Sequence, residues 1–169
     1  MNTPIKLYTL PYTSYRTYLL ASLFVAGNLL LPQIVHFIPQ GGLLFLPIYF
    51  FTLVAAYKYG IYAGLCTALL SPIANHLIFG MPPEGMLPII LMKSVLLAFA
   101  AAYASKYFKT VSILALLIVV VAYQLAGTLI ESVVLTDFRT ALAGVKMGLP
   151  GMLLQVFGGF LVLKALSKL

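Results

Sequence analysis

The sequence predicts an all-α integral membrane protein, and three observations lead to this fold class. The 169-residue chain is 63% hydrophobic and only 8% charged, whereas about a quarter of the residues in a soluble domain carry a charge. Its mean hydropathy is +1.09. Six apolar segments follow one another, separated by short stretches with glycine, proline or charge. We therefore expect one domain of six transmembrane helices, residues 1–169, and no separate soluble catalytic or nucleotide-binding domain.

The six predicted spans cover residues 17–37, 43–57, 60–79, 86–105, 111–135 and 146–166. A helix needs roughly 20 apolar residues to cross the hydrocarbon core. The second segment is shorter than this, so we expect it to be tilted or partly covered by its neighbours. Small residues recur at helical spacing on the third, fourth and sixth segments, which favours a compact bundle because small side chains let membrane helices approach closely.

Lysine and arginine residues set the predicted orientation. With a cytoplasmic N-terminus, the inner side holds Lys6, Arg16, Lys58, Lys106, Lys109, Lys164 and Lys168, and the outer loops hold Arg139 and Lys146. This bias follows the positive-inside rule and predicts that both termini are cytoplasmic. It also accounts for the net charge of +7 without nucleic acid as a partner. The first 16 residues lack the features of a secretory signal, so we expect them to be retained.

The other polar residues gather at the predicted outer ends of the helices. They are His36, Gln40, Asn75, His76, Glu84, Glu131, Asp137, Arg139 and Lys146. Lys93 follows Met86 by seven residues, which places it about 10 Å below the outer edge of its helix at a rise of about 1.5 Å per residue. All three carboxylates of the chain thus fall in its outer half, and this asymmetry predicts a polar pocket open to the outside.

Ionisable residues inside a membrane are costly unless a partner or a ligand meets them, so they mark a candidate site. Lys93 is a candidate anchor for a carboxylate or phosphate; alternatively, it pairs with Glu131 inside the protein or reaches toward the outer headgroups. Glu131 and Gln124 share a helix face, and they either bind donors of a ligand or hold helices together. Gln155, on the small-residue face of the last segment, is a further candidate for ligand contact.

Further candidates lie toward the predicted outer mouth. His36, Asn75 and His76 either form hydrogen bonds with a ligand or belong to the polar belt of the interface. Arg139 and Asp137, in the last outer loop, form either a clamp over an anionic ligand or a surface pair of little energetic consequence. No metal and no cofactor are expected, because no His-x3-His or His-x2-Glu spacing supplies several ligands from one helix face.

Three motifs carry a resemblance to a known family. They are LLLPQIVHFIP at residues 29–39, GGLLFLPIYF at 41–50 and YGIYAGLCTALLSPIANHLIFGMPP at 59–83. The chain resembles the substrate-binding S components of energy-coupling factor (ECF) type vitamin transporters in these motifs, in its length and in its number of spans. The resemblance implies a six-helix protein of a bacterial or archaeal cytoplasmic membrane. Such a protein captures a small water-soluble vitamin or micronutrient from outside.

The resemblance also implies partners. S components do not hydrolyse ATP; they dock on a transmembrane coupling subunit that carries two ATPase subunits. The sequence agrees, because it contains no G-x-x-x-x-G-K-[ST] phosphate loop. The family often uses Ala-x-x-x-Ala on the first helix for docking. Here Ala21 and Ala26 are one residue too far apart, whereas Ser22 and Ala26 have the right spacing. Small residues at this spacing would serve the same steric purpose.

The sequence thus predicts a binding protein and not an enzyme, and it leaves the ligand open. The charges of Lys93, Glu131 and Arg139 would suit a polar ligand with a carboxylate, of which pantothenate is one possibility. One alternative is a structural membrane scaffold of the MreD kind, which would need partner surfaces but no ligand. Another is a small membrane-embedded enzyme acting on lipid or isoprenoid, although the acidic pairs and Ser/His arrangements of such chemistry are not found in the sequence.

Overall fold

The computed structural model describes residues 3–4, 7–35, 37–134 and 136–166. In the described residues the helices are α1 (Tyr15–Val35), α2 (Gly41–Phe45), α3 (Phe50–Tyr59), α4 (Ile61–Phe79), α5 (Leu87–Phe108), α6 (Ile113–Val134), α7 (Phe138–Met147) and α8 (Leu149–Leu166). Two 3₁₀ turns, η1 (Pro47–Tyr49) and η2 (Glu84–Met86), precede α3 and α5. A short antiparallel pair joins β1 (Thr3–Pro4) to β2 (Thr110–Val111).

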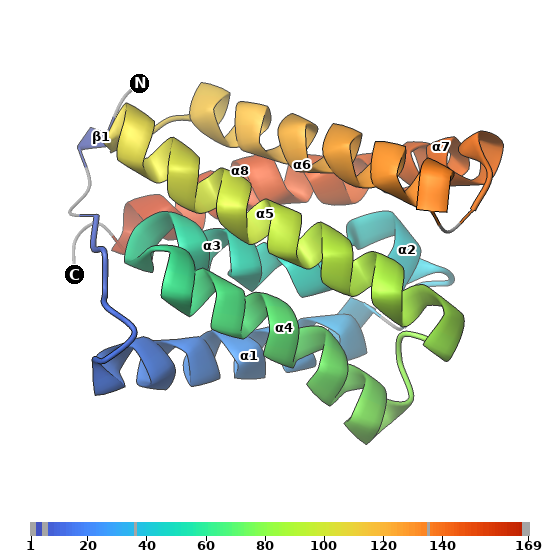
Figure 1. Ribbon diagram of the computed structural model, residues 1–169, viewed down its shortest axis with the longest axis horizontal. Coiled ribbons are helices and arrows are strands. Elements are labelled where there is room, and N and C mark those ends of the chain that lie inside the picture. The colour runs from blue at the N-terminus through green and yellow to red at the C-terminus, as the bar shows by residue number, and fades with distance from the viewer. Residues whose placement is uncertain (1–2, 5–6, 36, 135, 167–169) are drawn as a thin grey trace.

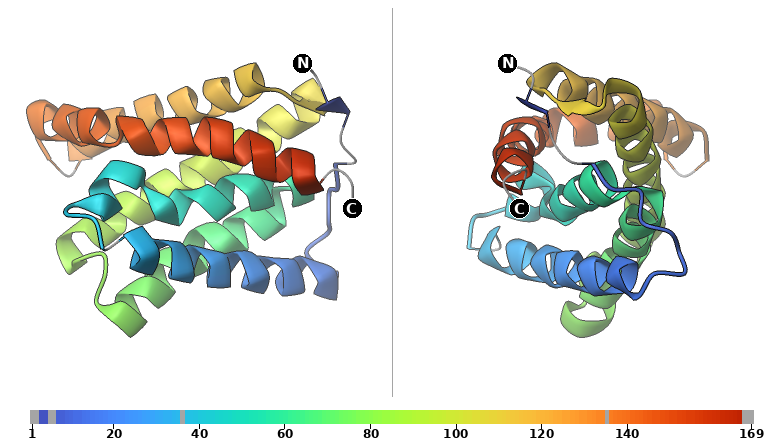
Figure 2. Two further views of the ribbon diagram at one scale, coloured as in Figure 1. Left: turned by 180° about the vertical axis from the view of Figure 1, so that it is seen from behind. Right: turned by 90° about the vertical axis from the view of Figure 1, so that its left-hand side faces the viewer.

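The long helices run side by side with alternating direction (Figures 1 and 2). The first and last described residues therefore lie at one end of the bundle, which we call the terminal end. The opposite end carries α2, η2 and α7, and we call it the α7 end (Figure 1). The described residues contain six helical segments long and apolar enough to cross a membrane, as the sequence predicts.

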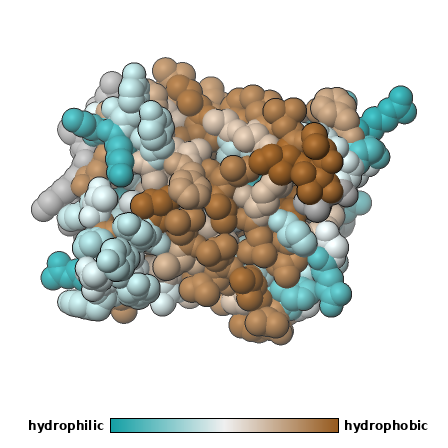
Figure 3. Space-filling view, viewed as in Figure 1, coloured by the Kyte–Doolittle hydropathy of each residue, from teal (hydrophilic) through white to brown (hydrophobic). Residues whose placement is uncertain are grey.

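The bundle surface is apolar around its middle. Figure 3 shows a hydrophobic belt between two more polar ends. Large exposed side chains on this surface include Leu23, Leu30, Phe99, Leu125 and Leu161. Soluble monomers rarely expose contiguous apolar patches of more than a few hundred Å². The surface is therefore of the kind that a multi-pass membrane protein presents to lipid.

The second predicted span is divided into α2, η1 and α3. The helix breaks at Leu46, whose φ of 48° lies in the left-handed region, and at Pro47, which has no backbone N–H to donate. In the segment from Gly41 to Tyr59, 67% of the residues of an 18-residue stretch are buried, which confirms that neighbouring helices cover it. Close packing depends on small residues, since a Cβ on Gly64 would lie 2.5 Å from the Cβ of Ala56.

The helix α7 was not predicted from the sequence, which indicated a loop at residues 136–146. Asp137 caps this helix: its Oδ1 accepts from the Thr140 backbone N–H at 2.7 Å and its Oδ2 from the Thr140 hydroxyl at 3.0 Å. These hydrogen bonds lower the pKa of the exposed Asp137 carboxyl below its ordinary 3.8. The helix contacts α6, α2 and α8 and so covers part of the α7 end.

The N-terminal segment crosses the terminal end of the bundle. The backbone N–H of Tyr8 donates to the carbonyl of Lys58, and that of Leu10 donates to the carbonyl of Tyr59. The Lys58 side chain is 1% exposed, and its Nζ donates to the backbone carbonyl of Leu166 at the end of α8. These contacts tie the start of the chain, α3 and α8 together.

Candidate functional site

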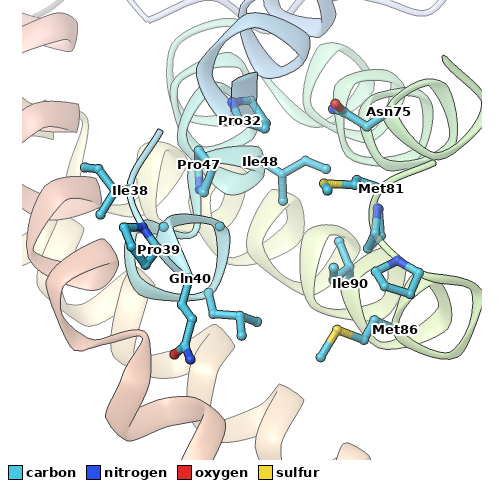
Figure 4. A pocket seen from close by; sticks show the side chains of 15 residues that line it. Pro32, Ile38, Pro39, Gln40, Pro47, Ile48, Asn75, Met81, Met86 and Ile90 are labelled. Carbon is cyan, nitrogen blue, oxygen red and sulfur yellow. The ribbon is translucent and has the colours of Figure 1, made fainter. Parts of the chain in front are cut away.

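A cavity of about 380 Å³ opens at the α7 end and is the strongest candidate for a ligand site. Figure 4 shows apolar side chains from α1, the α2 region and the α4–α5 turn around it. Its wall consists of Pro32, Ile38, Pro39, Gln40, Gly41, Gly42, Leu43, Pro47, Ile48, Asn75, Met81, Pro82, Pro83, Met86 and Ile90. A mostly apolar wall with a few polar groups is typical of small-molecule sites.

A smaller cavity of about 140 Å³ adjoins the first and reaches the charged residues. The two cavities share Gly42, Leu43, Ile48, Met86 and Ile90. The rest of the smaller wall consists of Leu46, Tyr49, Ile89, Lys93, Gln124, Glu131, Gly144 and Met147. The apolar space and the buried charges are thus neighbouring parts of one region.

Two glycines, Gly41 and Gly151, let α2 pack close to its neighbours, so that α2 forms part of the wall that the two cavities share. A Cβ on Gly41 would lie 2.2 Å from the carbonyl oxygen of Val35 at the end of α1. A Cβ on Gly151 would lie 2.5 Å from the carbonyl carbon and oxygen of Phe45. Backbone approaches this close exclude any side chain, so glycine at both positions seats α2 between α1 and α8.

The turn after α4 forms the opposite wall of the larger cavity. Gly80 ends α4 with a φ of 67°, a conformation that glycine adopts without strain. His76 Nδ1 donates to the carbonyl of Pro82 at 2.7 Å. His76 is partly buried and lines neither cavity, so its observed contact is with the turn that carries Met81 and Pro83 into the wall.

Lys93 on α5 and Glu131 on α6 form an ion pair in the wall of the smaller cavity. Lys93 Nζ lies 2.5 Å from Glu131 Oε2, and the two side chains are 11% and 9% exposed. Glu131 Oε2 is buried and lies against this ammonium. The sequence left open whether Lys93 meets Glu131 or a ligand, and the geometry allows both because both side chains face the cavity.

Gly127 makes room for Lys93 and was missed by sequence reasoning. A Cβ at this position on α6 would lie 2.7 Å from Lys93 Cγ, 3.2 Å from Cε and 3.4 Å from Cδ. The aliphatic part of Lys93 therefore lies against the bare backbone of α6, one helical turn before Glu131. The signal in the sequence was a glycine four residues before a buried carboxylate, on the same helix face.

Gln124 lines the same cavity and carries a hydrogen-bond acceptor that has no donor partner among the described residues. The residue is 5% exposed and lines the cavity, and its Oε1 has no hydrogen-bond partner in the part of the chain that the structure describes. Buried polar atoms are normally paired, because burying one without a partner costs free energy. Gln124 therefore carries a buried acceptor without a partner in the described chain, on a side chain that lines the cavity.

Gln155 lies behind this region and lines neither cavity. It is fully buried, and its Oε1 accepts from the hydroxyl of Tyr123 at 2.9 Å. The ring of Tyr123 packs at 5.8 Å, centroid to centroid, against Tyr49, which does line the smaller cavity. Gln155 thus supports the wall through two tyrosines.

Asn75 contributes to helix packing and also lines the larger cavity. Its Nδ2 donates to the backbone carbonyls of Asn28 and Ser71, at 2.9 Å and 3.2 Å, whereas its Oδ1 has no partner among the described residues. Asn28, buried within α1, donates to the hydroxyls of Thr52 and Ser71 and accepts from the Phe51 backbone N–H. Sequence reasoning missed Asn28, although a lone asparagine within an apolar segment was the available signal.

The other predicted residues lie away from the two cavities. Arg139 is exposed in the first turn of α7 and lines neither cavity. Ser22 and Ala26 are exposed on α1. His36 lies outside the described residues. Among the residues that the structure describes, no three His, Cys, Asp or Glu side chains come together as metal ligands.

No family model, curated protein or solved structure matches this chain.

Proposed function

We propose that this chain is the substrate-binding S component of an ECF-type transporter and captures a small molecule in the cavity at the α7 end. The observation that carries the proposal is an apolar cavity of about 380 Å³ that continues into a smaller one walled by the Lys93–Glu131 pair. The motifs that resemble this family form the wall: the end of α1, the α2 region and the α4–α5 turn all line the larger cavity.

The charge distribution supports a cavity that faces outward. Basic residues near the terminal end are Arg16, Lys58, Lys106, Lys109 and Lys164, whereas Arg139 and Lys146 lie on α7. Under the positive-inside rule, this excess orients the terminal end to the cytoplasm. The α7 end then meets the external medium, where a water-soluble nutrient arrives.

Uptake against a gradient requires partners under this proposal. The chain carries no phosphate-binding loop of the P-loop type, so ATP hydrolysis falls to two ATPase subunits held by a transmembrane coupling subunit. The exposed Ser22 and Ala26 on α1 offer a smooth surface for a coupling helix. Ala26→Phe should spare ligand binding and block uptake in cells that express the coupling module; impaired binding with normal uptake would contradict this docking face.

The first experiment identifies the bound molecule directly. The protein is purified in mild detergent, and any small molecule that survives purification is identified by mass spectrometry. A high-affinity binding protein should retain close to one molecule per chain. An empty protein with no thermal shift across a panel of vitamins would contradict the proposal and favour a structural scaffold.

A pair of glycine variants assigns the bound molecule to the cavity. Gly42 lines both cavities, and a Cβ there would meet nothing within 4 Å. Gly42→Leu should therefore extend into the shared space without a clash at its Cβ and abolish ligand retention. Gly85→Leu is the matched control, because its Cβ also meets nothing within 4 Å and Gly85 lines neither cavity. Loss of the ligand in both variants, or in neither, would place the site elsewhere.

A further inference from the structure

We propose that the ligand's buried head group is uncharged overall and combines an N–H or O–H donor with a carbonyl-type acceptor, as an amide, a ureide or a lactam does. The inference rests on the proposed function and names the class of ligand that the site takes. An uncharged head group differs from the carboxylate that Lys93 suggests when the sequence is considered alone.

The charge balance of the smaller cavity carries the first step. Lys93 and Glu131 neutralise one another at 2.5 Å, and each side chain is about nine-tenths buried. A ligand carboxylate placed here would leave one negative charge without a partner in a poorly solvated space. A buried charge without a partner is costly, whereas a neutral or zwitterionic group adds no net charge to the pair. The pair therefore selects against single anions and single cations.

The hydrogen-bonding groups of the wall carry the second step. Gln124 Oε1 is an acceptor without a hydrogen bond from the described residues, whereas Glu131 Oε2 lies 2.5 Å from the ammonium of Lys93. Gln124 and Glu131 belong to one helix, at positions separated by seven residues, and therefore lie on one face of α6 about two turns apart. The ammonium of Lys93 carries three N–H donors. A head group with an N–H or O–H donor for Gln124 and a carbonyl oxygen for Lys93 satisfies this wall.

The larger cavity receives the rest of the molecule. Its wall is built mainly of proline, methionine, isoleucine and glycine, which suits an apolar or aromatic body (Figure 4). Two polar side chains, Gln40 and Asn75, belong to this wall, and Asn75 Oδ1 is buried and without a donor from the described part of the chain. A second donor on the body of the ligand would pair with it.

The test compares matched probes on the full-length chain in detergent. Nicotinamide with nicotinate and benzamide with benzoate differ in the head group and share the ring. The wild type should prefer the carboxamide by about tenfold or more in apparent Kd, measured from thermal shift titrations, because only the carboxylate leaves an uncompensated charge. If a molecule is retained through purification, mass spectrometry identifies its head group as charged or uncharged.

Two variants test the residues. Glu131→Gln removes the anion of the pair, so the remaining charge of Lys93 should shift the preference toward the carboxylates. Gln124→Leu should weaken binding of carboxamides while leaving the Tm of the empty protein unchanged or higher, because it removes a buried unpaired oxygen. Gln33→Leu is the matched control: Gln33 is partly buried on α1, lines neither cavity, and should leave binding unchanged.

The outcomes separate this inference from the proposed function. Preference of the wild type for carboxylates, or a retained molecule with an anionic head, overturns the inference and keeps the binding function. Carboxamide binding that Gln124→Leu leaves unchanged overturns the assignment of Gln124. An empty protein with no shift for any probe overturns both. If a molecule is retained but no probe binds, the head group of the retained molecule tests the inference: an uncharged head group supports it and an anionic one overturns it.

Discussion

Gly127→Ala tests whether the bare backbone of α6 positions Lys93. The added Cβ would lie 2.7 Å from Lys93 Cγ, closer than real Cβ contacts come, and 3.2 Å from Cε. Because Cγ is near the root of the side chain, rotation of the outer bonds alone cannot relieve the contact. Lys93 must therefore shift away from α6, and its Nζ must move relative to Glu131 and the cavity.

The expected magnitude follows from two opposing terms. Overpacking of this kind costs about 1–3 kcal/mol, whereas alanine is about 1 kcal/mol more favourable than glycine within a helix. The variant should therefore lose about 0–2 kcal/mol of unfolding free energy. In a Lys93→Ala background the obstructing Cγ, Cδ and Cε are gone, so Gly127→Ala should stabilise by about 1 kcal/mol. The coupling between the two sites should be about 1–3 kcal/mol.

The assay is a double-mutant cycle on the purified protein. Tm is measured for the wild type, both single variants and the double variant; for a chain of this length, about 1 kcal/mol corresponds to about 2–4 °C. Ligand affinity is measured on the wild type and on Gly127→Ala, where it should fall. Gly85→Ala is the control, since its Cβ meets nothing within 4 Å. Additive effects of Gly127→Ala and Lys93→Ala would refute the role of Gly127.

Three further predictions concern the Lys93–Glu131 ion pair, the capping of α7 by Asp137 and the hydrogen bonds of Asn28. Lys93→Met should lower the unfolding free energy by about 3–5 kcal/mol by leaving the Glu131 carboxylate alone, and Lys93→Met/Glu131→Leu should regain most of it, as measured by reversible unfolding in detergent. The pKa of Asp137 is lowered in the folded protein, so the stability from its capping of α7 is fully present above the unfolded pKa and is lost as pH falls through the folded pKa. Hydrogen exchange of the α7 amides, corrected for intrinsic rates, should therefore accelerate in that acid range. In Asp137→Ala this exchange should already be fast at neutral pH. Asn28→Ala should cost about 2–4 kcal/mol through its lost hydrogen bonds and lower Tm; an unchanged Tm would contradict its role.

The long helices could be predicted from the sequence because apolar length is a local property. The third segment, expected at 60–79, is Ile61–Phe79, and the fourth, expected at 86–105, is Leu87–Phe108. The helix α7 could not be found in this way, because ten residues with Arg139 and Lys146 are too short and too polar for a span. Its signals were a capping aspartate three residues before Thr140 and an amphipathic spacing.

Of the residues predicted from the sequence, Lys93, Glu131, Gln124 and Asn75 line the two cavities, whereas His76, Gln155 and Arg139 do not. Lys93 and Glu131 attract attention separately, since each is a charge in an apolar segment. The sequence offered their contact as one alternative, because the rotation of α5 against α6 that decides it cannot be read from a single sequence. Gly127 and Asn28 illustrate the same limit: one acts through an absent side chain and the other through bonds to α3 and α4.

The buried contact between Lys58 and Leu166 joins two parts of the chain that are synthesised at different times. Lys58 lies on the third helix, and the carbonyl that accepts from its ammonium is supplied 108 residues later by the final one. Until α8 has been made and packed, this cation has to find water or lipid phosphate at the membrane surface. A product that stops short of α8 would lack the carbonyl that accepts from this amine.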